Sequence, residues 1–180
     1  MIGVLVSGEG TNLQALLDAG LPVGAVASNK PGARALERAT RAGIPTAIFD
    51  LSEYASRDER DEAMAGWLQA HGVELVVCAG YMHLLEPAFL DRFRDRVVNV
   101  HPAPLPEFPG PHPLEDLLAA GARETAATVH YVDEGVDTGP VIASELVPVL
   151  PGDTVAALRK RVHEVEHRLL PIVVRELCER

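Results

Sequence analysis

The chain has 180 residues, of which 47% are apolar, and it carries a formal net charge of -10. This length supports one domain with a full hydrophobic core, and this composition excludes a disordered chain or a fibre. The acidic balance argues against nonspecific binding to nucleic acid or to an acidic membrane, because no basic excess is available to neutralise phosphates.

The two cysteines, Cys78 and Cys178, lie far apart and do not follow the spacing of a metal site. We therefore expect neither a disulfide framework nor a bound metal, which fits a reducing cytoplasm. Met1 leads straight into an apolar run, so we expect no signal peptide, and the longest apolar run is too short to span a membrane. A cytoplasmic protein is the expectation.

Short apolar runs alternate with helical patterns over the first hundred residues. Continuous apolar runs are typical of strands that are buried on both faces. Their alternation with helices predicts a parallel sheet in a Rossmann-like, doubly wound α/β domain. We expect strands at 2–6, 22–29, 45–49, 74–80 and 96–101, and helices at 11–20, 32–43, 56–72 and 87–93.

The pattern changes after a proline-rich stretch that follows residue 101. Residues 125–132 and 139–149 alternate in part, which favours two longer strands paired antiparallel. Residues 153–180 form one long amphipathic pattern, typical of a helix. No repeat or linker interrupts the chain, so we expect a single domain over residues 1–180.

A glycine-containing turn, Ser-Gly-Glu-Gly-Thr-Asn, follows the first predicted strand at residues 7–12. Gly8 and Gly10 permit a tight turn, and the helix N-terminus behind them offers free N–H groups that suit a phosphate. The third glycine of a dinucleotide fingerprint is missing, because Leu13 stands there, and no Walker lysine is present. One terminal phosphate is favoured over NAD or ATP, and an ordinary turn capped by Thr11 or Asn12 remains the alternative.

Asn99 and His101 stand two residues apart at the end of the fifth predicted strand, so they face the same side. Ligands of parallel sheets bind beyond the carboxyl ends of the strands. An amide and an imidazole there suit the stabilisation of a developing oxyanion and the movement of protons. Asp137, in a glycine-flanked loop, is the best candidate for a carboxylate that orients the histidine. The alternatives are a structural hydrogen bond for His101 and a turn role for Asp137.

Four segments, in order along nearly the whole chain, carry a resemblance to a known family. The chain resembles the formyltetrahydrofolate-dependent formyltransferases, whose fold is the α/β arrangement described above. The turn from Gly8 to Gln14 narrows the match to the branches that act on glycinamide ribonucleotide or hydrolyse formyltetrahydrofolate. The segments are Ser-Gly-x-Gly-Thr-Asn-Leu-Gln (7–14), Asn-Val-His-Pro (99–102), Leu-Pro-x-Phe-Pro-Gly-x-His (105–112) and Val-Asp-x-Gly-x-Asp-x-Gly-Pro (132–140).

The resemblance implies transfer of the formyl group of 10-formyltetrahydrofolate to the amine of 5'-phosphoribosylglycinamide, in de novo purine biosynthesis. Hydrolysis of the folate, or transfer to another amine, is the alternative. Small molecules are then the partners, with no metal, nucleic acid or membrane, and the chain is a monomer or homodimer. The implied catalytic residues are Asn99, His101 and Asp137. Those for the ribonucleotide are Gly10, Thr11, Asn12, His163, Glu164, Val165 and Glu166. Those for the folate are Arg57, Met82, His83, Leu84, Leu85, Asn99, Asp133, Glu134, Gly135, Val136 and Asp137.

Some of these residues also have structural interpretations, and some positions depart from the family pattern. Met82, Leu84 and Leu85 read equally as core, and Arg57 stands in a charge run of the kind that usually forms a solvated helix face. His130 reads as a structural strand residue. His83 replaces an arginine that is common in the family, which changes one expected folate contact.

Overall fold

The computed structural model describes residues 1–179, and they divide into two compact units. The first unit is residues 1–98, and the second begins at Asn99, inside the strand β5 (Val97–His101).

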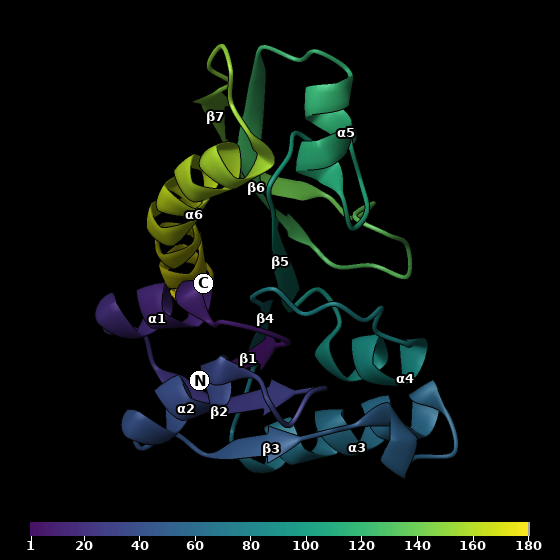
Figure 1. Ribbon diagram of the computed structural model, residues 1–180. Coiled ribbons are helices and arrows are strands. Elements are labelled where there is room, and N and C mark those ends of the chain that lie inside the picture. Colours follow the sequence, from purple (N-terminus) through teal and green to yellow (C-terminus); the bar gives the residue numbers. More distant parts are fainter. Residues whose placement is uncertain (180) are drawn as a thin grey trace. The chain divides into compact units, whose positions relative to one another are not determined.

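The first unit is built on parallel strands covered by helices (Figure 1). Strand β1 pairs in parallel with β2 on one side and with β4 on the other, and β2 pairs in parallel with β3. The strand order in this unit is β3-β2-β1-β4, followed by the start of β5. Every residue of β1 and β4 is buried, which explains their continuous apolar runs. The bounds are β1 Ile2–Val6, α1 Thr11–Asp18, β2 Val23–Ser28, α2 Arg34–Arg41, β3 Thr46–Ile48, η1 Leu51–Glu53, α3 Arg57–Ala70, β4 Leu75–Cys78, α4 Pro87–Leu90 and η2 Asp91–Phe93.

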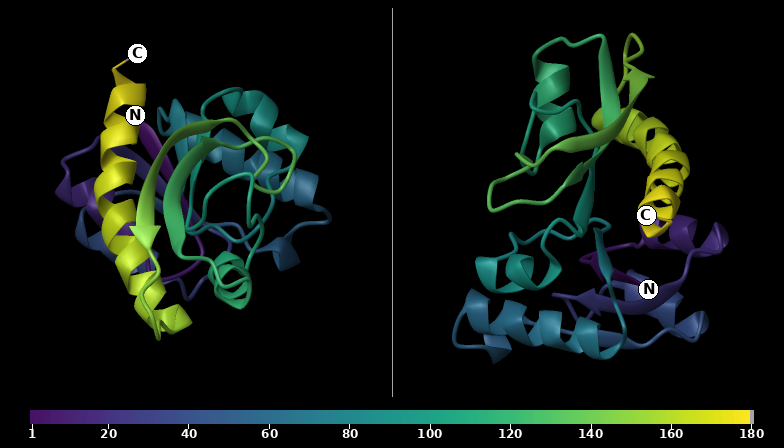
Figure 2. Two further views of the ribbon diagram at one scale, coloured as in Figure 1. Left: turned by 90° about the horizontal axis from the view of Figure 1, so that it is seen from above. Right: turned by 180° about the vertical axis from the view of Figure 1, so that it is seen from behind.

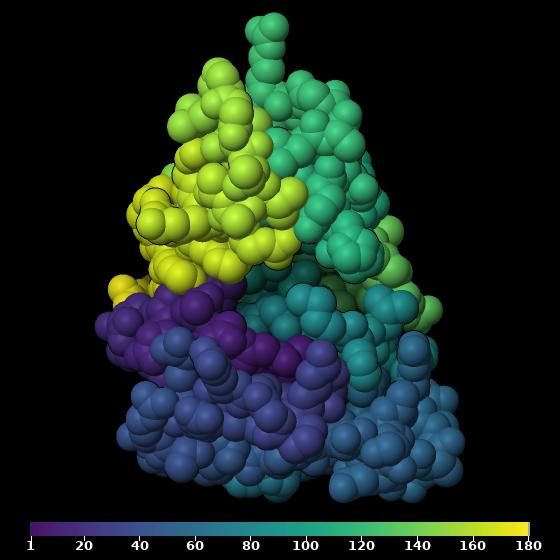
Figure 3. Space-filling model, in the orientation of Figure 1, coloured from purple at the N-terminus to yellow at the C-terminus, as the bar shows by residue number. Residues whose placement is uncertain are grey.

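The second unit combines an antiparallel strand pair with two helices. After the end of β5 come β6 and β7, which pair antiparallel from Glu124↔Pro148 to His130↔Val141. Helix α6 lies along this pair in both views of Figure 2, and the surface view shows α6, β7 and the α5 region adjoining one another (Figure 3). The bounds are α5 Pro113–Ala119, β6 Glu124–Tyr131, β7 Val141–Pro148 and α6 Val155–Cys178.

The core of the second unit fixes α6 on the strand pair. Leucines from α5 and α6 pack with Ala127 of β6 and Val147 of β7 in one buried cluster. Helix α6 begins where the side chain of Thr154 accepts a hydrogen bond from the backbone N–H of Ala157, at 3.2 Å. It then continues through Pro171 to Cys178.

The predicted fold class is confirmed: a Rossmann-like, mostly parallel sheet ends in an antiparallel pair. Helix α5 was not predicted, because it is short and lies in the proline-rich stretch, with Pro113 in its first turn. Within residues 1–179, no helix has both the length and the apolar composition needed to cross a membrane.

Candidate active site

The end of β5 places two polar side chains in an otherwise apolar strand. Val97, Val98 and Val100 are buried, whereas Asn99 is partly exposed. His101 is 4% exposed. Pro102 follows and supplies no backbone N–H, so the strand ends directly after His101. The amide and the imidazole therefore project from the carboxyl end of a strand, as the sequence predicted.

The loop between β6 and β7 carries Asp137 in a tightly constrained conformation. A Cβ on Gly139 would lie 1.9 Å from the carbonyl oxygen of Tyr131, so only glycine fits there. The carboxylate of Asp133 accepts hydrogen bonds from the backbone N–H of Gly135, at 3.0 Å, and from the hydroxyl of Thr138, at 2.6 Å. Asp137 has φ of 53°, a left-handed conformation in which aspartate is enriched. The loop thus holds Asp137 in one position.

The carboxylate of Asp137 contacts both residues from β5. Its Oδ2 lies 3.4 Å from Nδ1 of His101, and its Oδ1 lies 3.4 Å from Nδ2 of Asn99. The backbone N–H of Gly110 also donates to Oδ2, at 2.9 Å. The second unit therefore brings together the three residues that the sequence proposed as catalytic.

The two nitrogens of the His101 ring each face a hydrogen-bond acceptor. Nε2 lies 2.9 Å from the carbonyl oxygen of Phe108, and a carbonyl only accepts, so Nε2 carries a hydrogen. In the neutral ring the lone pair of Nδ1 would then face the carboxylate of Asp137. Protonated at Nδ1, the ring would instead form an ion pair with this carboxylate, which lies 3.4 Å away.

The charge of Asp137 is stabilised by its neighbours. Burial raises the pKa of the carboxyl, but the hydrogen bonds from His130 and Gly110 and the charges of His101 and His130 outweigh it. The pKa of Asp137 is therefore held below its ordinary value. At neutral pH this residue is a carboxylate that supports a positive charge on the imidazole.

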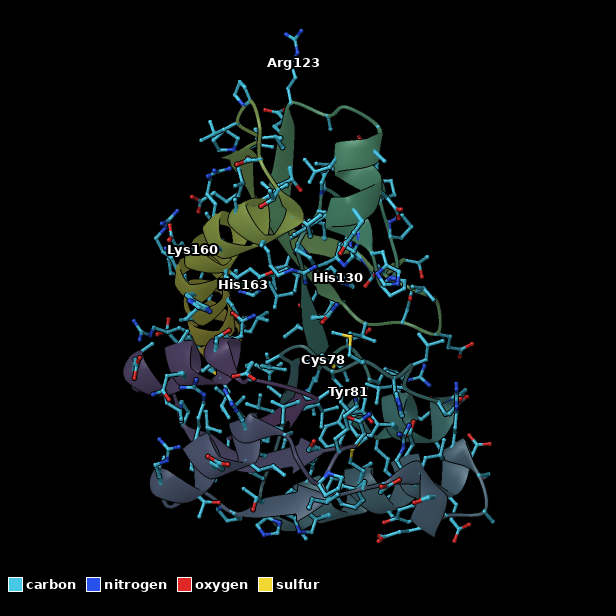
Figure 4. All side chains as sticks on the ribbon, in the orientation of Figure 1. Cys78, Tyr81, Arg123, His130, Lys160 and His163 are labelled. Atoms are coloured by element: carbon cyan, nitrogen blue, oxygen red, sulfur yellow. The ribbon has the colours of Figure 1, made fainter. Side chains whose placement is uncertain are left out.

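His130 is a fourth member of the cluster that the sequence analysis assigned to a structural role. It lies on β6 (Figure 4) and is 1% exposed. Nδ1 donates to the carbonyl oxygen of Tyr131, at 2.7 Å, while Nε2 lies 3.2 Å from Nδ2 of Asn99 and 3.4 Å from Oδ1 of Asp137. With its hydrogen on Nδ1, the neutral ring can accept a hydrogen bond at Nε2 from the amide of Asn99. A ring protonated at Nε2 as well can instead donate from Nε2 to the carboxylate of Asp137. Only its place on β6, one residue from the strand end, could have suggested this role.

The predicted ribonucleotide residues fall into both units. In the first unit, Gly10 has φ of 73°, and a Cβ there would lie 2.5 Å from the Cβ of Ala35. Gly10 is also the N-cap of α1. No side chain caps the N-terminus that begins at Thr11 and Asn12, and a helix N-terminus is the kind of backbone environment that suits an anion.

The remaining ribonucleotide residues, 163–166, lie on α6 in the second unit, and His163 and Lys160 project from this helix in Figure 4. Glu166 is 3% exposed, so its side chain is buried. Burial, together with the charge of Arg159, lowers the pKa of His163. A hollow of about 640 Å³ is lined by this face of α6, including Arg159, Lys160 and His163.

The predicted folate residues of the first unit lie after β4, apart from Arg57 at the start of α3. Met82 is 67% exposed and Leu84 is 46% exposed, while Leu85 is buried. Arg57 is exposed and lies 3.9 Å from the carboxylate of Glu86. Met82 and Leu84 are thus not core residues, which was one of the two interpretations. The other predicted folate residues, 133–137, form the loop of the second unit described above.

An amide, an imidazole and a carboxylate brought together in this way are groups with which enzymes stabilise charge on a reacting carbonyl oxygen. Comparison with known proteins identifies which enzymes of this class the chain resembles. The chain belongs to the formyl transferase family, whose model matches residues 1–174.

Several relatives and solved structures are similar to the chain. The phosphoribosylglycinamide formyltransferase of Mycobacterium tuberculosis is 46% identical over 97% of this chain and 83% of that protein. The crystal structure of glycinamide ribonucleotide transformylase 1 from Symbiobacterium toebii has a TM-score of 0.97 and 46% identity, covering 99% of this chain and 87% of that one. The trifunctional purine biosynthetic protein adenosine-3 of Drosophila melanogaster is 44% identical over 94% of this chain, which spans only 13% of that protein's length.

Proposed function

We propose that this protein transfers the formyl group of 10-formyltetrahydrofolate to the amine of 5'-phosphoribosylglycinamide, a step of de novo purine biosynthesis. The observation that carries the proposal is the contact of one carboxylate, Asp137, with both His101 and Asn99 at 3.4 Å. The names of the similar proteins from Mycobacterium tuberculosis and Symbiobacterium toebii support the choice of substrates.

In the proposed mechanism, the acceptor nitrogen attacks the formyl carbon and forms a tetrahedral intermediate. The amide of Asn99 donates to its oxygen, and Nε2–H of His101 donates to the same oxygen in place of its contact with the carbonyl oxygen of Phe108. Asp137, which faces Nδ1, keeps the imidazole charged. The bond from the formyl carbon to the folate nitrogen then breaks. The acceptor nitrogen loses a proton and the folate nitrogen gains one, so that N-formylated ribonucleotide and tetrahydrofolate leave.

The binding assignments are part of the same proposal. Gly10, Thr11 and Asn12 hold the phosphate, and residues 163–166 recognise the glycinamide. Residues 82–85, 133–137 and Arg57 hold the folate. The folate derivative is a co-substrate, and the mechanism relies on protein donors without a metal ion.

We also propose that residues 1–180 act as a single domain in the cytoplasm, as a monomer or homodimer, on small molecules alone. The match of one family model to residues 1–174 supports the single domain. The net charge of -10 supports the absence of a nucleic-acid partner.

The test is an assay of folate release with and without the ribonucleotide acceptor. Release of tetrahydrofolate only when phosphoribosylglycinamide is present supports the proposal. Release without an acceptor would instead identify a formyltetrahydrofolate hydrolase, and release only with another amine would identify a different acceptor. Asn99→Ala and His101→Ala are each expected to lose about 10²–10³ in rate while remaining folded. Normal turnover in either variant contradicts the assignment of its residue.

A further inference from the structure

The N-terminal half of α3 carries an ion pair that is wholly buried. Arg60 and Asp61 are both 0% exposed, and Nε of Arg60 donates to Oδ1 of Asp61 at 2.6 Å. Adjacent residues of a helix do not normally face each other, and burial of charge is costly unless each group is fully bonded. The charge run at 57–62 was interpreted as a solvated face, and that interpretation is wrong for this pair. The other hydrogen bonds of the two side chains therefore indicate what the pair does in the fold.

Both side chains of the pair reach the segment Met82–Glu86, which follows β4 in the same unit. Nη1 of Arg60 lies 2.9 Å from Nδ1 of His83, and Oδ2 of Asp61 accepts from the backbone N–H of Glu86 at 2.8 Å. The hydroxyl of Ser7, at the end of β1, accepts from the backbone N–H of Met82 at 2.9 Å. Three buried or partly buried contacts thus fix a segment that has no helix or strand of its own.

The contact with Arg60 determines where His83 carries its hydrogen. A guanidinium only donates hydrogen bonds, so Nδ1 of His83 must accept, and the hydrogen of the neutral ring is on Nε2. Protonation of Nδ1 would set its N–H against the N–H of Arg60. Burial and then the charges of Arg60, Arg57 and Lys30 lower the pKa of His83, opposed by Asp61. Neutral His83 with Nε2–H is the form that this environment stabilises.

The neighbours of His83 indicate the kind of ligand that this segment suits. Met82 and Leu84, on either side of His83 in the sequence, have exposed side chains. The partly exposed imidazole lies edge-on to the ring of Tyr81, with the ring centroids 6.0 Å apart. An apolar surface with a single N–H donor suits a flat heteroaromatic ring that carries hydrogen-bond acceptors. The folate of the proposed reaction has such a ring.

We propose that Arg60 is a positioning residue, which holds His83 in its neutral Nε2–H form so that His83 donates one hydrogen bond to the folate ring between Met82 and Leu84. This inference rests on the proposed function for the identity of the ligand. The family commonly has an arginine at position 83. In this protein position 83 is a histidine, and the positive charge comes from the buried guanidinium of Arg60 that contacts it.

The first experiment measures the His83 ring itself and does not depend on activity. Two-dimensional ¹⁵N NMR of the histidine rings reports the tautomer and the titration of each ring. His71 is an internal reference of the opposite kind, because its Nδ1 donates to the carbonyl oxygen of Trp67 at 2.8 Å. We expect Nε2–H at His83 and Nδ1–H at His71. A predominant Nδ1–H tautomer at His83 overturns the proposal, whatever reaction the protein performs.

The second experiment compares variants at the partly exposed position 83, which replace neither member of the buried pair. In His83→Gln the side-chain oxygen accepts from Arg60 and the amide still donates, whereas in His83→Leu neither is possible. Binding of tetrahydrofolate, measured by calorimetry, is expected to weaken about tenfold in His83→Leu and less than threefold in His83→Gln. Equal losses in the two variants contradict the proposal.

The variant Arg60→Met tests the positioning role directly. We expect the His83 ring to become a mixture of tautomers and to protonate at higher pH, with Arg60→Lys restoring the original form. An unchanged ring in folded Arg60→Met contradicts the proposal. If Arg60→Met does not fold, Arg60→Lys takes its place in the NMR experiment. The wild-type tautomer of His83 in Arg60→Lys supports the positioning role, and a changed tautomer opposes it. Failure of formyl transfer with the expected NMR result would reject the proposed function but not the linkage of Arg60 to His83.

Discussion

Replacement of Asp137 by asparagine removes a charge while keeping the shape of the side chain. The asparagine oxygen still accepts from the backbone N–H of Gly110, so the loop conformation is retained. What is lost is the attraction of the carboxylate for the rings of His101 and His130, each at 3.4 Å. Asp137→Asn should therefore fold normally and turn over slowly.

The magnitude follows from these two contacts. Hydrogen bonds to charged groups contribute about 1.5–3 kcal/mol each, and the length of both contacts places them at the weak end of this range. Two contacts of about 1.5 kcal/mol give about 3 kcal/mol, which corresponds to a fall in kcat of roughly 10²-fold.

The assay is steady-state formyl transfer with both substrates saturating, alongside urea unfolding of the same preparations. Asp116→Asn is the matched control, because it makes the same chemical change at an exposed position of α5 in the same unit. The control should keep the wild-type kcat. A kcat for Asp137→Asn within threefold of the wild-type value would refute the role of the carboxylate.

Four further predictions concern stability. Gly139→Ala should lower the free energy of unfolding by at least about 1–3 kcal/mol, because its Cβ would meet the Tyr131 carbonyl at 1.9 Å. Gly66→Ala, in the middle of α3 with open space around it, should raise that free energy by about 0.5–1 kcal/mol; urea unfolding that gives both variants the same sign contradicts this account. Thr154→Ala should destabilise the protein by about 1 kcal/mol through loss of the cap of α6, and an unchanged urea midpoint would argue against the cap. Because the folded pKa of Asp137 lies below the ordinary 3.8, its carboxylate stabilises the fold fully above pH 3.8 and loses this contribution as the pH falls below it. The stability difference between wild type and Asp137→Asn should therefore shrink on acidification below that value, and a difference that grows instead contradicts the sign.

Much of the fold could be predicted from the sequence, because the central strands β1 and β4 are buried along their whole length. β1, β4 and β5 are short apolar runs bounded by glycine, proline or polar residues, and such runs locate parallel strands well. Helix α5 escaped prediction because seven residues within a proline-rich stretch give too little periodicity.

The site was predictable only in part. The strand position of Asn99 and His101 placed both side chains on one face, but nothing in the sequence places Asp137, on a loop 36 residues beyond His101, against them. That contact depends on the turn of the β6–β7 pair and on the tight fit at Gly139. The burial of Arg60 and Asp61 could not be predicted from residue type either. Charged side chains are almost never buried unless they are paired, and the sequence does not show that these two side chains pair in the folded protein.

The most direct test of the central claim follows the formyl carbon. The protein is mixed with 10-formyltetrahydrofolate that carries ¹³C in its formyl group, with and without phosphoribosylglycinamide, and the products are identified by NMR. The account predicts that the label moves to the glycinamide nitrogen, and only when the ribonucleotide is present. Label recovered as formate, in equal amount with and without the ribonucleotide, would contradict it.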